Sequence, residues 1–414
     1  MSAAGRLSRL LGSIWFRRLR LEGPPLPEGA VLLLLNHPNA LMDPMVAAAL
    51  LPRTPRFVAK ATLWQQPVLR PFLALFNPIP VHRTQEGGGA DATAKTFAAV
   101  HEAFAAGDVV GLFPEGISHG LPDLAPLKTG AARLALSSPV PVSLVPAGLV
   151  YGERRLFRQG VLLRVGEAIA FGDLQPGGLD PENVRALTAR IRGALLPLTL
   201  HGREAERLRL AQNLAWLLAE EPSAISDLEA FRLRVQALLS TLEAMQPEAR
   251  RRLRHRVRAA QRWLRASGLR PDQVGHPYPF QEIVSWLPKV GLRLVLAPLL
   301  LPFTLLFVPP VWIVDRAVRS LAREVDMVAT TGLLMGLTFF LAWTGAGAWL
   351  SHHEGWPWFF APLAWIPAYF GLRLFERLRE DVQAVRGFRA RRAKAAPRLL
   401  EAKRMLLEAF PELG

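Results

Sequence analysis

Residues 31–44 read VLLLLNHPNALMDP, and this stretch decides the fold. Its apolar run predicts a β-strand that leads directly into His37, with Asp43 and Pro44 following shortly after. Because α/β folds place their sites at the carboxyl ends of strands, the pattern indicates a site at His37 and Asp43. A plainer interpretation also fits: Asp43 caps a helix that begins at Pro44, and His37 is an ordinary turn residue.

The chain around this stretch alternates short apolar runs with helical stretches from residue 30 to about residue 171. The predicted strands are residues 31–36, 57–59, 109–113, 142–147 and 161–165. The predicted helices are residues 44–51, 91–106 and 131–137. This alternation predicts an α/β fold, a mixed sheet covered by helices, for a catalytic domain over residues 25–180.

Other regions of the chain have a different character. Residues 1–24 are predicted to be a basic amphipathic helix on a membrane surface, centred on residues 7–21, because arginines interrupt the apolar residues throughout. Residues 181–285 are predicted to be an α-helical accessory region, since apolar residues recur there at helical spacing. Residues 376–414 are predicted to be a basic cytoplasmic helical tail.

Residues 286–375 are predicted to be a membrane region, because three apolar segments there approach the ~20 residues of a bilayer-spanning helix. The first segment, residues 294–314, contains four prolines and is predicted to be either re-entrant or spanning. Residues 327–350 and 356–372 are predicted spans. If the first segment is re-entrant and does not span, all basic regions of the chain lie on the same side of the membrane. We therefore expect an integral cell-membrane protein whose catalytic domain faces the cytoplasm.

The composition limits the classes of molecule that the protein is predicted to bind. A net charge of +16 combined with a positive mean hydropathy indicates anionic membrane lipids. No nucleic-acid partner is predicted, because the basic residues lack interleaved aromatic platforms. The chain has no cysteine, which excludes disulfides, thiolate metal sites and cysteine nucleophiles. His352, His353 and Glu354 are interpreted as membrane-edge residues, so no metal site is predicted.

The residue types at the first site suit general base catalysis. Imidazole takes a proton near neutral pH without a large shift of its pKa, which makes His37 the predicted base. Asp43 would hold the ring tautomer and stabilise the imidazolium.

Four later runs complete a pattern. They are NPIPVHR at residues 77–83, VVGLFPEGISH at 109–119, LKTGAARLAL at 127–136 and VSLVPAGLVYG at 142–152. With the first stretch, they resemble the motifs of the glycerolipid acyltransferase family, which acylates glycerol 3-phosphate and lysophosphatidic acid. The family's first motif is Asn-His-x4-Asp, and here the interval is one residue longer. That departure resembles the fungal-type glycerol-3-phosphate and dihydroxyacetone-phosphate acyltransferases.

The resemblance implies roles for the later residues. Arg83 ends the second motif and would bind the acceptor phosphate, for which its planar fork is suited. Glu115 would bond the acceptor's hydroxyls, and Gly116 would let the backbone come close. Ser118 stands where the family's third motif has an arginine, so phosphate binding would depend more on Arg83 and Lys128.

The resemblance also implies an activity: direct transfer of a fatty acyl group from acyl-CoA or acyl-carrier-protein to a hydroxyl of glycerol 3-phosphate. No cofactor is expected. Lysophosphatidic acid is the alternative acceptor. Residues 116–120 also match the Gly-x-Ser-x-Gly pattern of serine esterases, although Pro114 and Glu115 precede the serine where a strand should end. An inactive membrane scaffold is a further alternative, which the altered spacing between His37 and Asp43 favours.

Overall fold

The computed structural model describes residues 2–65, 70–81, 90–154, 156–219, 227–272, 276, 278–321, 324, 326–392, 401, 403–405, 407–408 and 410–411. The chain divides into two compact units. The first comprises Met1–His201 together with Glu324–Thr330, and the second comprises Gly202–Arg323 with Thr331–Gly414. The first unit is therefore discontinuous in sequence.

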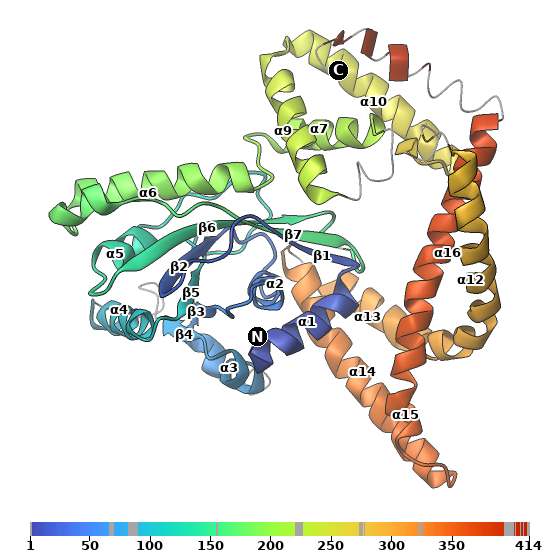
Figure 1. The fold of residues 1–414 in the computed structure, drawn as a ribbon, viewed down its shortest axis with the longest axis horizontal. Helices are drawn as coiled ribbons and strands as arrows, with labels where there is room; N and C mark the ends of the chain where they lie inside the picture. The colour runs from blue at the N-terminus through green and yellow to red at the C-terminus, as the bar shows by residue number, and fades with distance from the viewer. Residues whose placement is uncertain are drawn as a thin grey trace. The chain divides into compact units, whose positions relative to one another are not determined.

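A seven-stranded sheet forms the centre of the first unit (Figure 1). Its strands are β1 (Arg18–Glu22), β2 (Ala30–Leu35), β3 (Arg56–Lys60), β4 (Ile79–Val81), β5 (Val109–Leu112), β6 (Val142–Tyr151) and β7 (Gly160–Val165). Their spatial order is β1-β7-β6-β2-β5-β3-β4. The pairing is parallel except between β6 and β7, which are antiparallel. The mixed sheet predicted from the sequence is thus confirmed.

Helices cover both faces of this sheet. They are α1 (Ala3–Trp15), α2 (Met42–Leu50), α3 (Arg70–Phe76), α4 (Ala90–Ala105), α5 (Gly130–Leu136) and α6 (Pro181–Leu195). Leu32 and Leu34 of β2 share a core with Phe104 of α4, Ala132 of α5 and Leu187 of α6. Every residue of β2 is buried although successive side chains point to opposite faces, so β2 is a central strand covered on both sides.

Strands β2, β5, β3 and β4 run in the same direction, so their carboxyl ends meet at one edge of the sheet. His37 follows the end of β2 by two residues, and Glu115 follows the end of β5 by three. The fold therefore brings two of the predicted motifs to one edge, as expected for an α/β site.

The prediction of one helix over residues 7–21 was wrong in its second half. Helix α1 ends at Trp15, and β1 then pairs in parallel with β7. The sequence of β1, RLRLE, alternates polar and apolar residues with the period of a strand. Strand β4 was also missed, because three residues carry too little pattern to be recognised.

The second unit is helical. Its elements are α7 (Ala205–Leu217), α9 (Leu228–Ala244), α10 (Pro247–Ser267), α12 (Phe280–Leu306), α13 (Val308–Leu321), α15 (Phe360–Leu363) and α16 (Trp365–Arg392). Helix α14 (Met327–His353) begins in the first unit and continues into the second. Helices α12 and α16 pack against each other, and α7 packs against α9.

Two helices of the described chain are long and apolar enough to cross a membrane, judged by length and composition alone. They are α12 and α14, with mean hydropathies of 1.7 and 1.5. The predicted boundaries therefore need correction. Residues 294–314 are divided at Phe307 between α12 and α13. Residues 356–372 are divided between α15 and α16, and the apolar part of α16 ends at Arg373.

Candidate active site

The loop after β2 brings His37 and Asp43 together. Nδ1 of His37 lies 2.8 Å from Oδ2 of Asp43. Between them the chain turns, with Met42 N donating to Asn39 O at 2.9 Å and Ala40 at a left-handed φ of 41°. This turn accommodates the additional residue of the motif. The N-cap of α2 is Leu41, and Asp43 lies inside the first turn, so the interpretation of Asp43 as a helix cap is wrong.

The Asp43 carboxylate is fully buried and held by three donors. Oδ2 accepts from Asn39 N at 2.7 Å as well as from His37, and Oδ1 accepts from the Tyr151 hydroxyl at 2.6 Å. An ionised carboxylate only accepts hydrogen bonds, so His37 carries its proton on Nδ1. Nε2 is then the ring atom that can take a proton from a substrate.

Aromatic packing fixes the plane of the His37 ring. The ring stacks on Phe113, with centroids 3.8 Å apart and planes 10° apart, and Phe113 stacks in turn on Phe57. The His37 side chain stays 18% exposed. The imidazole is thus held rigidly on one face while part of it remains accessible.

Glu115 joins the two loops of the site. Oε1 accepts from His37 N at 2.8 Å, while Oε2 accepts from Ala125 N at 2.7 Å and contacts Nε2 of His119. The side chain is only 1% exposed. The prediction that Glu115 bonds the acceptor's hydroxyls stays a prediction; in the structure this side chain is buried and bonds His37 N and Ala125 N.

Gly116 and Lys128 lie side by side. Gly116 has a φ of +73°, which glycine adopts without strain, and a Cβ there would lie 3.4 Å from Cγ of Lys128. Lys128 is exposed, and its backbone N donates to Pro114 O at 2.7 Å. Arg83 lies outside the described residues. Strand β4, which precedes it, ends at Val81.

Ser118 is bonded within the protein, its hydroxyl donating to Oδ2 of Asp326 at 2.5 Å. In the continuously described stretch 90–154, no helix occurs between the end of β5 and Gly130. A nucleophile elbow needs a helix directly after the serine. The esterase pattern is therefore present in the sequence without its structural context.

Asp326 and Thr330 each contact one loop of the candidate site. Asp326 accepts from Ser118, and the Thr330 hydroxyl accepts from Leu41 N at 3.1 Å. Both residues are nearly buried, with 3% and 6% of their surface exposed. We name these two contacts, Ser118 with Asp326 and Leu41 with Thr330, the α14 clamp. One more link joins the loops, because Arg154 donates to the carbonyls of Pro38 and His119.

Sequence reasoning missed Tyr151, Arg154, Asp326 and Thr330. Tyr151 lies in the run at residues 142–152, at the end of β6. Nothing in the local sequence shows that its hydroxyl bonds the carboxylate of Asp43, 108 positions earlier. The α14 clamp is separated from the loops it holds by more than 200 residues. Only the folded topology brings these groups together.

Tyr151 gives the site a measurable pH dependence. Burial raises the pKa of its phenol well above the ordinary value, and the negative charge of Asp43 raises it further. A raised pKa in the folded state stabilises the protein fully below the unfolded tyrosine's pKa of about 10, and this contribution is lost as pH rises above it. Thermal stability should therefore fall more steeply above about pH 10 in the wild type than in Tyr151→Phe.

The measurement is a series of thermal unfolding curves across alkaline pH for both proteins. An ultraviolet titration gives the matching optical test, because Tyr278 and Tyr369 are the only other tyrosines. Parallel pH profiles in the two proteins would contradict the assignment of a buried, protonated Tyr151.

Comparison with known proteins shows what this chain is similar to. A family model described as Acyltransferase matches residues 18–150. Glycerol-3-phosphate O-acyltransferase 2 of Saccharomyces cerevisiae is 32% identical over 127 residues, which cover 28% of this chain and 17% of the relative. An uncharacterized acyltransferase of Schizosaccharomyces pombe is 30% identical over 115 residues, covering 26% and 17%. The chain thus spans about a sixth of the length of these relatives.

Among solved structures, the 1-acyl-sn-glycerophosphate acyltransferase of Thermotoga maritima is similar with 20% identity and a TM-score of 0.34, over 46% of this chain and 76% of that chain. The family model covers β1 to β6, and so includes His37, Asp43, Glu115 and Lys128. The resemblance inferred from the motifs is confirmed, because residues 18–150 match the Acyltransferase family model.

Proposed function

We propose that this protein is a membrane-bound O-acyltransferase that moves a fatty acyl group from an acyl thioester to a hydroxyl of glycerol 3-phosphate, in the formation of phosphatidic acid. The observation that carries the proposal is the 2.8 Å contact between His37 Nδ1 and Asp43 Oδ2 at the carboxyl end of β2. A buried carboxylate behind a partly exposed imidazole is the arrangement that general base catalysis of hydroxyl attack requires.

The proposed reaction proceeds without an acyl-enzyme. The acceptor hydroxyl oxygen attacks the thioester carbonyl carbon while Nε2 of His37 takes the hydroxyl proton. The tetrahedral intermediate then collapses, the carbon–sulfur bond breaks, and the imidazolium returns the proton to the leaving thiolate. Asp43 keeps the ring oriented and stabilises the imidazolium during both steps. The products are an ester and a free thiol, and no cofactor is needed.

Cationic side chains at the same edge would bind the acceptor phosphate. Lys128 is exposed and lies beside Gly116. Arg83 lies outside the described residues and is proposed from the motif alone. We assign phosphate binding to Arg83 and Lys128. Glu115 and Ser118 act indirectly, because both are bonded within the protein.

The acceptor is proposed from similarity and the donor from chemistry. Similarity to the yeast glycerol-3-phosphate acyltransferase favours glycerol 3-phosphate. The two candidate membrane helices favour lysophosphatidic acid as the second candidate, because that acceptor partitions into lipid. Acyl-CoA and acyl-carrier-protein are both thioesters that suit the mechanism. We place the enzyme in the cell membrane, on anionic lipids, with the first unit facing the cytoplasm.

The test is an acyl-transfer assay with labelled acyl-CoA and acyl-carrier-protein, offered glycerol 3-phosphate or lysophosphatidic acid. Glycerol 3-phosphate should be acylated with the higher kcat/KM, and a preference for lysophosphatidic acid would reverse the order of the two acceptors. Failure on both acceptors with both donors would leave the inactive scaffold as the better description.

Ser118→Ala separates direct transfer from serine chemistry in the same assay. Loss of one hydrogen bond to Asp326 should lower the rate by no more than about tenfold, because a typical hydrogen bond contributes roughly 0.5–1.5 kcal/mol. A serine nucleophile would instead be indispensable, and its replacement would remove activity altogether. Complete loss with Ser118→Ala and an intact fold would therefore sink the direct-transfer mechanism.

A further inference from the structure

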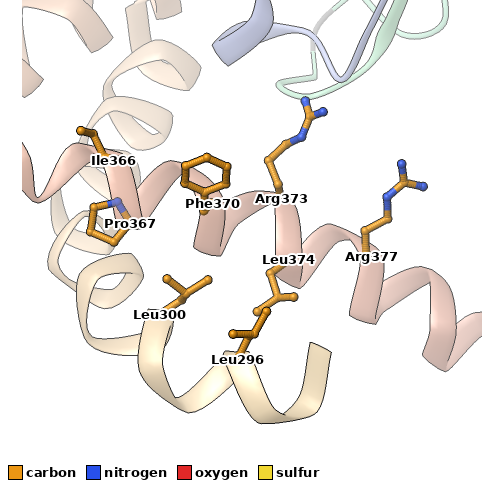
Figure 2. A pocket seen from close by; sticks show the side chains of 8 residues that line it. All are labelled: Leu296, Leu300, Ile366, Pro367, Phe370, Arg373, Leu374 and Arg377. Atoms are coloured by element: carbon orange, nitrogen blue, oxygen red, sulfur yellow. The ribbon is translucent and has the colours of Figure 1, made fainter. Parts of the chain in front are cut away.

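The second unit contains an open groove between α12 and α16. Its volume is about 520 Å³, within the range of ligand sites. Two arginines and six apolar residues line it: Leu296 and Leu300 from α12, and Ile366, Pro367, Phe370, Arg373, Leu374 and Arg377 from α16. We call it the α12–α16 groove. Figure 2 shows the two arginine side chains extending to the same side, away from Leu296 and Leu300.

Specific contacts fix the two helices that form the groove. Asp381 of α16 accepts from Arg293 of α12 at 2.6 Å and from Nε1 of Trp286 at 2.8 Å. Farther along, the helices approach so closely that a Cβ on Gly371 would lie 2.1 Å from the Thr304 hydroxyl oxygen. These contacts fix how α12 and α16 are aligned along each other. The shape of the groove between them therefore depends on these contacts.

The charges at the groove are unbalanced. Arg293 is neutralised by Asp381, but Arg373 has only a ring contact with Tyr369 and, among the residues that the structure describes, no carboxylate partner. Arg377 bonds Glu380 at 3.2 Å with its side chain 58% exposed, and such exposed pairs contribute little. Arg373 is thus available to bind an anion. Arg377 can also bind one, by exchanging its exposed contact with Glu380.

We propose that the α12–α16 groove binds an anionic phospholipid, with its phosphate on Arg373 and Arg377 and an acyl chain along the apolar walls. The two arginines are four residues apart on one helix and so face the same side. Guanidinium groups bind phosphate through paired charged hydrogen bonds. Basic pockets beside membrane helices bind anionic headgroups in this way, and α12 is one of the two candidate spans.

Apolar walls next to cations distinguish a lipid from a free anion. Inorganic phosphate would use the arginines alone and gain nothing from Phe370 or Leu296. A lipid uses both parts, so its affinity must fall when either part is altered. The site is independent of the proposed acyl transfer, since none of its residues belongs to the unit that carries His37 and Asp43.

The experiment measures binding of fluorescent phosphatidic acid and phosphatidylcholine to the full chain in detergent. Wild type should prefer phosphatidic acid, and Arg373→Gln and Arg377→Gln should each weaken its binding about fivefold, the effect of one basic residue near a lipid surface. Arg379→Gln is the matched control, because Arg379 is exposed on the same helix outside the groove. An equal loss of phosphatidic acid binding in Arg379→Gln would mean that the positive charge of α16 attracts the lipid in general. That result would overturn the assignment of a specific site to the groove.

A second variant tests the apolar wall. Leu296→Trp fills the groove from its exposed side and leaves both arginines in place, and Leu296 is already 36% exposed, so the fold should tolerate the change. Phosphatidic acid binding should fall in this variant. Unchanged binding, or full competition by inorganic phosphate in the wild type, would show that the arginines bind a phosphate ion and would overturn the lipid assignment.

Discussion

His37→Ala should lower kcat for acyl transfer by about 10²–10⁴-fold, the contribution of a positioned general base. The acceptor hydroxyl is a weak nucleophile until a base removes its proton. Nε2 of His37 is the atom proposed to accept that proton. The KM for the acceptor should change little, because we propose Arg83 and Lys128, and not the imidazole, as the phosphate-binding groups. Steady-state acyl transfer with purified protein checks both quantities.

The matched control is His101→Ala. His101 lies on α4 in the same unit, where its Nε2 is 3.3 Å from the Ser137 hydroxyl, away from the site. This variant should retain activity within a few-fold and show that loss in His37→Ala does not reflect unfolding. A His37→Ala protein with near-wild-type kcat would exclude the proposed base.

The second large effect is expected from Asp43→Asn. The side chain keeps its shape, but its amide N–H₂ group can present a donor to Nδ1 of His37, which favours the wrong tautomer and removes the charge that stabilises the imidazolium. By analogy with the serine protease triad, kcat should fall by up to about 10⁴-fold. The measurement is again steady-state kinetics, read together with binding of the acceptor.

Asp108→Asn controls for loss of an ordinary carboxylate. Asp108 pairs with Arg56 at 2.8 Å, and the two side chains are about one-third exposed. Exposed pairs contribute little, so activity and stability should both remain close to wild type. If Asp43→Asn also remained close to wild type, the contact between His37 and Asp43 would have no catalytic role.

The central part of this fold was predictable because its signals are local. The run that forms β2 is apolar throughout, ends in two polar residues and is followed by a helix-forming stretch. The same holds for β5 and the run that ends at Glu115. The carboxyl ends of parallel strands share an edge, and the parallel pairing of β2 and β5 in the structure brings His37 and Glu115 to that edge.

The rest depends on contacts between distant residues. β1 reads as the end of a basic helix until β7 is known to be its partner. The burial of Glu115 against Ala125 N and His37 N also follows from how two loops meet, which no spacing encodes. The apolar run of residues 356–372 likewise gave the wrong boundaries, because α16 begins at Trp365 and continues to Arg392.

The α14 clamp has a consequence for synthesis of the protein. Asp326 and Thr330, which bond the two loops of the candidate site, lie in a segment separated from the rest of the first unit by residues 202–323. The 129 residues from Gly202 to Thr330 take roughly 6–26 s to translate at about 5–20 residues per second. During that interval Ser118 and the Leu41 amide lack their partners. The nascent first unit therefore completes its site only as α14 emerges from the ribosome, which couples maturation of the enzyme to delivery of that helix.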